Sequence, residues 1–179
     1  MVDEQQSGFL VDDDILIPGC SEDDVYSLLD SIAHIINTDE ARLVLIDLSG
    51  RLDCYRGNNY LLGNPIRDYN EACDFFSAIR EEVQRRLIML GGEGLKRLDA
   101  HNQLYPNNRL PFIVVFIGEL SGLNLKRNND FRTALINDDA AGVYFVICTN
   151  KTVKSLNLGA DLNMFSVMDY ESALALFEV

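Results

Sequence analysis

The chain has 179 residues and a formal net charge of −13, from 28 acidic against 15 basic side chains. Its 47% of hydrophobic residues is enough for one full domain core, and no apolar run approaches the length of about 18 residues that a membrane span needs. The negative charge argues against a domain that binds nucleic acid by itself, because phosphate contacts need clustered Lys and Arg.

Residues 1–13 are acidic and polar, unlike a signal or transit peptide, and predict a flexible acidic arm before a domain at 14–179. A short strand from Asp14 then turns at Gly19 into a helix that Ser21 caps. The acids after Ser21 favour a helix N-terminus, and apolar residues from Val25 to Ile36 recur on one face. The later elements are strands at 42–47, 112–117, 142–148 and 165–168, helices at 69–90, 95–104, 130–136 and 170–177, and an irregular stretch at 151–161.

The stretch Leu110–Leu123 is the centre of the predicted sheet. Pro111 opens a run of six apolar residues that is too short for a helix and rich in β-branched side chains, which indicates a strand buried on both faces. Strands that alternate with helices predict an α/β fold with a mostly parallel sheet. Ligands lie at the carboxyl ends of such strands, so Glu119 and Asp47 are site candidates.

Other chemical groups are sparse. The bases that cluster at Arg80, Arg85, Arg86, Lys96 and Arg97 are interpreted as solvated helix faces rather than a binding patch. The cysteines Cys20, Cys54, Cys73 and Cys148 share no C-x-x-C spacing, and His34 and His101 are the only histidines. No metal site is therefore predicted, and a reducing compartment fits best.

Five blocks of residues carry a resemblance to a known family. They are Leu45–Asp47 with Leu52, Tyr55, Gly57, Leu61 and Leu62; Asp68 with Glu81–Arg86; His101–Asn102; Leu110–Leu123; and Ala141–Asn150. In this order they resemble the FtsK/SpoIIIE-type motor ATPases, which include the EssC/EccC ATPases of type VII secretion. The resemblance runs from Ile15 to about Phe177. It implies a RecA-like P-loop NTPase fold with helices on both faces of a mostly parallel sheet.

The departures from the family pattern are concentrated at its phosphate loop, G-x-x-G-x-G-K-S/T. In register, this chain has Gly19, Cys20, Ser21, Glu22, Asp23, Asp24, Val25 and Tyr26. Acids replace the inner glycines, Val25 replaces the lysine, and Tyr26 replaces the hydroxyl that binds Mg²⁺. The acids repel a triphosphate and favour an ordinary helix cap, so the resemblance implies a degenerate loop.

The family's second acidic site is also changed. Gly118 stands at the position of the aspartate that supports Mg²⁺, whereas Glu119 matches the water-activating glutamate. Asn150 replaces a glutamine at a strand end, and Asp139 falls where related chains carry an arginine directed at a neighbouring subunit. Glu119 and Asn150 are therefore interpreted as vestigial, because a general base without metal or bound phosphate has nothing to act on.

These features predict a pseudo-ATPase, without ATP or Mg²⁺ as cofactors, that is a structural, regulatory or protein-binding module of a secretion or translocation motor. One alternative is a divergent active ATPase that recruits Lys151, Lys154 or a neighbouring subunit and binds ATP and Mg²⁺. Another is a domain of a DNA translocase, against which the charge argues. The resemblance implies sibling ATPase domains, a secreted protein or secretion-apparatus partner, and a homo-oligomer, as a hexamer. It places the domain at the cytoplasmic face, excised from a membrane-anchored parent.

Several residues have simpler interpretations. Glu119 and Asp47 can accept hydrogen bonds from loop N–H groups, and Asn150 can cap a strand end. Tyr26 can cap or pack, and one hypothesis is that it fills the space of a nucleotide, so that Tyr26→Ala changes stability rather than activity. The pair Phe75–Phe76 is expected to be core plus partly exposed surface.

Overall fold

A five-stranded parallel sheet forms the centre of the computed structural model, which describes residues 13–36, 39–124, 127–136 and 138–177. The strand order is β2-β3-β4-β1-β5, and every strand pair is parallel. The bounds are β1 Ile15–Pro18, β2 Ala41–Ile46, β3 Phe112–Ile117, β4 Val143–Thr149 and β5 Ser166–Val167. The predicted α/β fold with a parallel sheet is confirmed.

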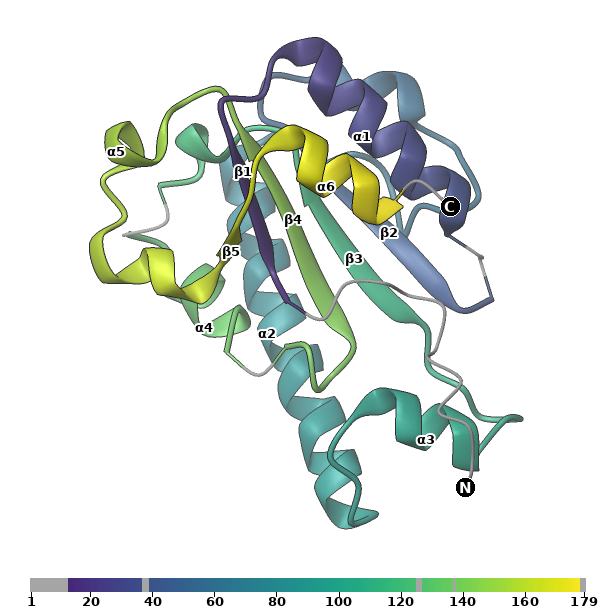
Figure 1. Cartoon of the computed structure of the whole chain (residues 1–179). Coiled ribbons are helices and arrows are strands. Elements are labelled where there is room, and N and C mark those ends of the chain that lie inside the picture. Colours follow the sequence, from purple (N-terminus) through teal and green to yellow (C-terminus); the bar gives the residue numbers. More distant parts are fainter. Residues whose placement is uncertain (1–12, 37–38, 125–126, 137, 178–179) are drawn as a thin grey trace.

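Helices cover both faces of the sheet (Figure 1). Helices α1 (Glu22–Ile35) and α6 (Tyr170–Phe177) pack on one face, and α2 (Tyr69–Gly92) and α4 (Asn129–Ala134) pack on the other. Alternate residues of β3 point to opposite layers: Phe112, Val114 and Phe116 contact the α1 layer, whereas Ile113, Val115 and Ile117 contact the α2 layer. The central strand is thus buried on both faces, as its apolar run predicts.

Two helix ends differ from the prediction. Helix α2 continues through Gly91 and Gly92, and it ends only where the N–H of Glu93 donates to three carbonyls of the last turn. Helix α3 spans Leu98–Leu104, so residues 95–97 lie outside it. The stretch 151–161, predicted as irregular, contains the short helix α5 (Val153–Leu156) and the start of a 3-10 helix, Gly159–Met164. These short turns depend on local caps such as Thr152, a signal that apolar spacing does not carry.

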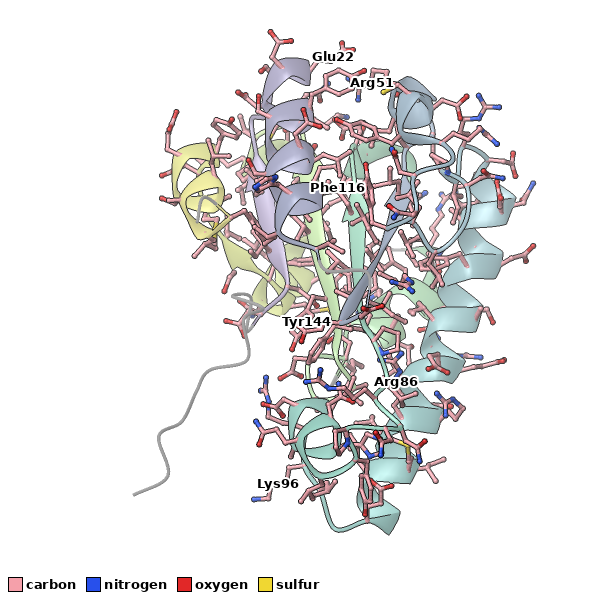
Figure 2. All side chains as sticks on the ribbon, turned by 90° about the vertical axis from the view of Figure 1, so that its right-hand side faces the viewer. Glu22, Arg51, Arg86, Lys96, Phe116 and Tyr144 are labelled. Atoms are coloured by element: carbon pink, nitrogen blue, oxygen red, sulfur yellow. The ribbon has the colours of Figure 1, made fainter. Side chains whose placement is uncertain are left out.

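The basic residues on α2 are not all solvated, which corrects their interpretation. Arg86 is only 3% exposed, and its guanidinium donates to Glu82 and to the carbonyls of Pro111 and Ala141. It ties α2 to the amino ends of β3 and β4, and Figure 2 shows it below the core residue Phe116, whereas Lys96 points outward. Three of the other bases, Arg80, Arg85 and Arg97, form ion pairs and are partly or fully exposed.

The predicted arm at 1–13 lies outside the described residues, except Asp13, which accepts a hydrogen bond from the Ser166 hydroxyl at 3.2 Å. In the parts of the chain that the structure describes, no helix is long and apolar enough to cross a membrane. The predicted aromatic pair divides as expected, because Phe76 is buried and stacks on Phe131 while Phe75 is partly buried.

Candidate functional site

The carboxyl ends of β1, β3 and β4 meet at one edge of the sheet and bring most of the predicted site residues together. Gly19 and Cys20 follow β1, Glu119 is the second residue after β3, and Thr149 ends β4. The Gly19 N–H donates to the Lys151 carbonyl at 3.1 Å, and the Cys20 N–H donates to the Thr149 carbonyl at 2.9 Å. The strand ends are therefore joined to one another directly.

The segment that aligns with the phosphate loop is mostly helix. Helix α1 begins at Glu22, so the five positions from Glu22 to Tyr26 are its first turns, and only Gly19, Cys20 and Ser21 remain as connection. Ser21 and Asp24 form a reciprocal capping box: the Asp24 N–H donates to Ser21 Oγ at 3.2 Å, and the Ser21 N–H donates to Asp24 Oδ2 at 2.8 Å. Glu22, Asp23 and Asp24 carry negative charge where the helix dipole favours it.

The side chains at the lysine and hydroxyl positions of the loop are used for packing. Val25 is 5% exposed and lies in the core beneath α1. Tyr26 is half-buried against the same core, and its hydroxyl donates to the Arg51 carbonyl at 3.1 Å. Burial is the first cause that raises the pKa of Tyr26, followed by the charge of Glu22.

Arg51 is a site residue that the sequence analysis missed. It begins the 3-10 helix Arg51–Tyr55, and its guanidinium lies 3.6 Å from the carboxylate of Glu22 (Figure 2). It is a cation beside the acids of α1, although its ion pair is exposed and weak. Its place after the carboxyl end of β2 could have been inferred from the sequence; its pairing with Glu22 depends on the fold.

Glu119 links the ends of β3 and β4. Its carboxylate accepts from the Thr149 hydroxyl at 2.7 Å, from the Asn150 N–H at 2.8 Å and from the Ser121 N–H at 2.9 Å. Burial alone raises the pKa of this group, but the donors, with the Asn150 N–H first, outweigh burial, and the pKa of Glu119 is lowered. A carboxylate with these three donors acts as a loop acceptor, which is the simpler of its two interpretations.

Gly118 and Asp47 are neighbours at the end of the adjacent strands. The Asp47 carboxylate accepts from the N–H and hydroxyl of Ser49 and from the Leu52 N–H, at 2.6 to 3.1 Å. A Cβ at Gly118 would lie 3.2 Å from Leu52 Cδ1 and 3.6 Å from Asp47 Cβ. The buried Leu52 side chain therefore fills the space beside the position where the family carries its aspartate.

The remaining predicted residues divide between two edges. Asn150 and Lys151 are exposed at the same edge as Gly19, and Lys154 lies on α5. Asp139 is at the opposite edge, before β4, with Arg97 Nη1 3.6 Å from its carboxylate. His101 and Asn102 are buried on α3, where Asn102 exchanges two hydrogen bonds with the backbone of Leu110. That pair anchors the entry to β3 and is not at the candidate site.

Curated relatives of the sequence are DNA translocases, and no model of a known protein family matches it. The DNA translocase FtsK of Caldanaerobacter subterraneus subsp. tengcongensis is 28% identical over 133 residues, covering 71% of this chain and 19% of the relative. The DNA translocase SpoIIIE of Bacillus subtilis is 24% identical over 141 residues, covering 71% of this chain and 18% of that relative. The chain spans about a fifth of the length of these relatives.

Solved structures share the fold. The pCW3 conjugation coupling protein TcpA, solved with ATPγS, has a TM-score of 0.65 at 19% identity over 87% of this chain and 47% of that one. EssC (ATPases 2 and 3) from Geobacillus thermodenitrificans has a TM-score of 0.64 at 18% identity, over 93% and 34%. EccC (ATPases 2 and 3) from Thermomonospora curvata, in complex with a signal sequence peptide, has 0.56 at 17%, over 79% and 25%. The fold is that of RecA-like P-loop ATPase domains.

Proposed function

We propose that this chain, a relative of the FtsK/SpoIIIE-type ATPases, is a domain that neither binds nor hydrolyses ATP and that serves a motor as a structural, regulatory or protein-binding module. The observation that carries the proposal is the start of α1 at Glu22, inside the segment where related chains hold phosphates. Five of the eight aligned positions are helical in this chain, and Val25 is buried at the lysine position.

A phosphate cradle needs N–H groups that are free to point at the anion. Here the N–H groups of Gly19, Cys20, Ser21, Asp24 and Val25 all donate to acceptors within the chain, at 2.8 to 3.2 Å. A triphosphate would have to break the capping box and approach three carboxylates. Each close pair of like charges costs about 1–4 kcal/mol at dielectric constants between those of water and a protein surface.

The groups for metal and base chemistry support the same proposal. Gly118 offers no carboxylate, and Leu52 occupies the adjacent space. Glu119 already accepts three hydrogen bonds, which hold it against the end of β4 rather than free for an incoming water. Neither ATP nor Mg²⁺ is therefore proposed as a cofactor, and Glu119 and Asn150 are structural in this proposal.

The proposed partners follow from the kinds of protein that share the fold. EssC and EccC carry several ATPase domains, and EccC was solved with a signal sequence peptide. We therefore place this domain beside sibling ATPase domains in a longer, oligomeric chain, where it contacts them or a secreted protein. Its place at the cytoplasmic face of a membrane-anchored parent belongs to the same proposal, and its net charge of −13 disfavours nucleic acid as a partner.

Calorimetric titration with ATP and Mg²⁺ tests the proposal, with ATPγS as a second ligand that excludes heat from turnover. The expected result is no saturable binding and no release of phosphate. Micromolar binding, with phosphate release that Glu119→Gln abolishes, would refute it.

One arrangement favours a divergent ATPase as the second candidate. Arg51 and Lys151 are cations at the edge where a nucleotide would lie. If they replace the lost lysine, Arg51→Ala and Lys151→Ala should each weaken nucleotide binding, whereas Arg109→Ala, which changes an exposed cation paired with Glu40, should not. The other alternative, a domain of a DNA translocase, is tested by a filter-binding assay with duplex DNA at several salt concentrations. Strong binding that weakens steeply with salt would favour it, because contacts with DNA phosphates depend on salt in this way.

A further inference from the structure

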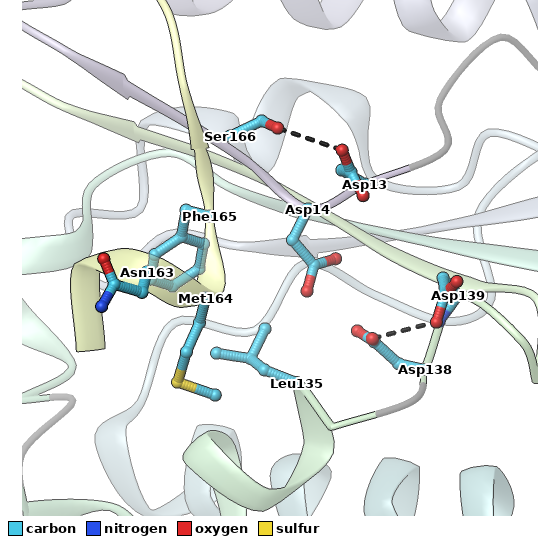
Figure 3. Close-up of a pocket in the computed structure, with 9 residues that line it drawn as sticks. All are labelled: Asp13, Asp14, Leu135, Asp138, Asp139, Asn163, Met164, Phe165 and Ser166. Atoms are coloured by element: carbon cyan, nitrogen blue, oxygen red, sulfur yellow. Dashed lines mark hydrogen bonds between the residues drawn. The ribbon is translucent and has the colours of Figure 1, made fainter. Parts of the chain in front are cut away.

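A pocket of about 280 Å³ lies at the edge of the sheet opposite the candidate site. Its lining residues come from the segments that immediately precede β1 and β4 and from the segment that leads into β5. Four aspartates, Asp13, Asp14, Asp138 and Asp139, line it together with apolar side chains (Figure 3). None of the residues that align with the phosphate loop takes part, so the pocket is independent of the proposed function.

Two of these aspartates are buried, which is costly for carboxylates. Asp14 is 7% exposed and Asp138 is 4% exposed, and their carboxyl groups point toward one another. Asp14 Oδ1 accepts from the Phe145 N–H at 2.7 Å, and Asp138 Oδ1 accepts from the Asp139 N–H at 3.0 Å. Asp138 Oδ2 is buried, and no N–H or hydroxyl group of the residues that the structure describes donates to it; the carboxyl group that faces it is that of Asp14.

When both carboxyls are ionised, Asp138 Oδ2 has no donor, and the surrounding negative charge favours a cationic one. The two other carboxylates cannot donate to it: Asp13 accepts from the Ser166 hydroxyl, and Asp139 is paired with Arg97 at 3.6 Å. We propose that this pocket binds a guanidinium or ammonium group on an aliphatic stem, such as the side chain of an arginine or lysine of a partner protein.

The lining selects this ligand class over a metal ion. Leu135, Met164 and Phe165 give the pocket an apolar side that suits methylene groups, and an aromatic ring attracts an organic cation. The volume exceeds that of a bare ion, and no three His, Cys, Asp or Glu side chains in the described parts of the chain are arranged to hold a metal. A planar guanidinium can also donate to both buried carboxyls at once.

The binding is linked to protons. Burial, followed by the charge of Asp138, raises the pKa of Asp14, and burial raises the pKa of Asp138, so the free pair retains a proton near neutral pH. An incoming cation replaces that proton as the donor to Asp138 Oδ2. Apparent affinity should therefore increase with pH until the proton is lost from the free pocket as well.

The test is a titration of the ¹⁵N-labelled chain with N-acetyl-arginine amide, followed through the N–H signals of Phe145 and Ser166, which donate to Asp14. N-acetyl-citrulline amide has nearly the same shape without the charge and is the matched ligand control. Spermidine reports whether a free polyamine binds as well as a peptide-like arginine does. Saturable shifts with either cation, but not with the citrulline compound, are expected. The cation that binds more tightly shows whether the natural ligand is a protein side chain or a free polyamine.

Asp14→Asn and Asp138→Asn each keep a side-chain oxygen that can accept from the backbone N–H of Phe145 or Asp139, and each is expected to weaken binding at least about tenfold. Asp74→Asn, an exposed aspartate on α2 outside the pocket, makes the same change of net charge and should leave binding unchanged. Equal shifts with citrulline, equal losses in the Asp74 variant, no saturable shift, or saturable shifts with Mg²⁺ or Ca²⁺ but not with the organic cations would each overturn the proposal. Melting curves of all three variants establish that each is folded.

Discussion

The capping box at Ser21 and Asp24 gives the sharpest test of how the start of α1 is used. If the segment is a helix cap, Asp24→Gly, which places a glycine where related chains have one, should destabilise the chain. The change removes the 2.8 Å bond from the Ser21 N–H, worth about 1 kcal/mol, and a favourable charge in the first turn, worth about 0.5 kcal/mol. Glycine has somewhat lower helix propensity than aspartate, so the total loss is about 1.5–2 kcal/mol.

Urea unfolding followed by circular dichroism measures this loss, and the melting temperature should fall by roughly 3–8 °C. Asp24→Asn is the control, because its amide oxygen retains the acceptor and only the charge is lost, for about 0.5 kcal/mol. Ser21→Ala completes a double-mutant cycle, in which the losses should be less than additive since the two residues bond each other. Unchanged stability in Asp24→Gly together with new nucleotide binding would refute the reasoning.

Four further predictions concern single side chains. Tyr26→Ala removes a half-buried ring and its bond to Arg51, and should lower stability by about 2–3 kcal/mol in urea unfolding; an unaltered melting point would count against the packing role. Gly118→Asp should cost about 1–3 kcal/mol because its Cβ meets Leu52, and a Mg²⁺ titration of its melting point should show no rescue. Arg86→Met should cost about 2–4 kcal/mol, since the carbonyls of Pro111 and Ala141 lose their donor while Glu82 keeps Arg85, whereas Arg85→Met on the exposed side of the same glutamate should cost under about 1 kcal/mol. Because burial and then Asp138 raise the pKa of Asp14 from 3.8 to about 9, the folded chain holds more protons than the unfolded chain between these values; stability should fall as pH rises across that interval, and Asp14→Asn should flatten the fall in urea unfolding at several pH values.

The strands and long helices could be predicted because their signals are local. The apolar run before Gly118 indicates a doubly buried strand, and the spacing from Val25 to Ile36 indicates one buried helix face. Short turns escaped prediction, since α5 depends on a single cap at Thr152. The end of α2 was also misplaced, because its two glycines are tolerated inside a helix that Glu93 terminates.

The position of the candidate site could be predicted from the sequence, but the contacts of its side chains could not. Parallel strands bring their carboxyl ends to one edge, so Gly19, Glu119 and Asn150 could be expected to lie together. The sequence does not indicate two of the three donors of Glu119, because Thr149 and Asn150 reach it from the end of β4, 30 and 31 positions further along the chain. Arg51 and the Asp14–Asp138 pair were missed for the same reason: their partners are distant in the chain.

By itself, the sequence determined the order of the elements, the two buried layers and the acidic helix start, since these depend on side-chain spacing and on neighbours within a few residues. Only the tertiary structure decided which carbonyls accept from the Gly19 and Cys20 N–H groups, which arginine is buried and where two aspartates face each other. Those features arise from contacts between residues at least 25 positions apart, and such contacts are set by how the strands align rather than by any local pattern.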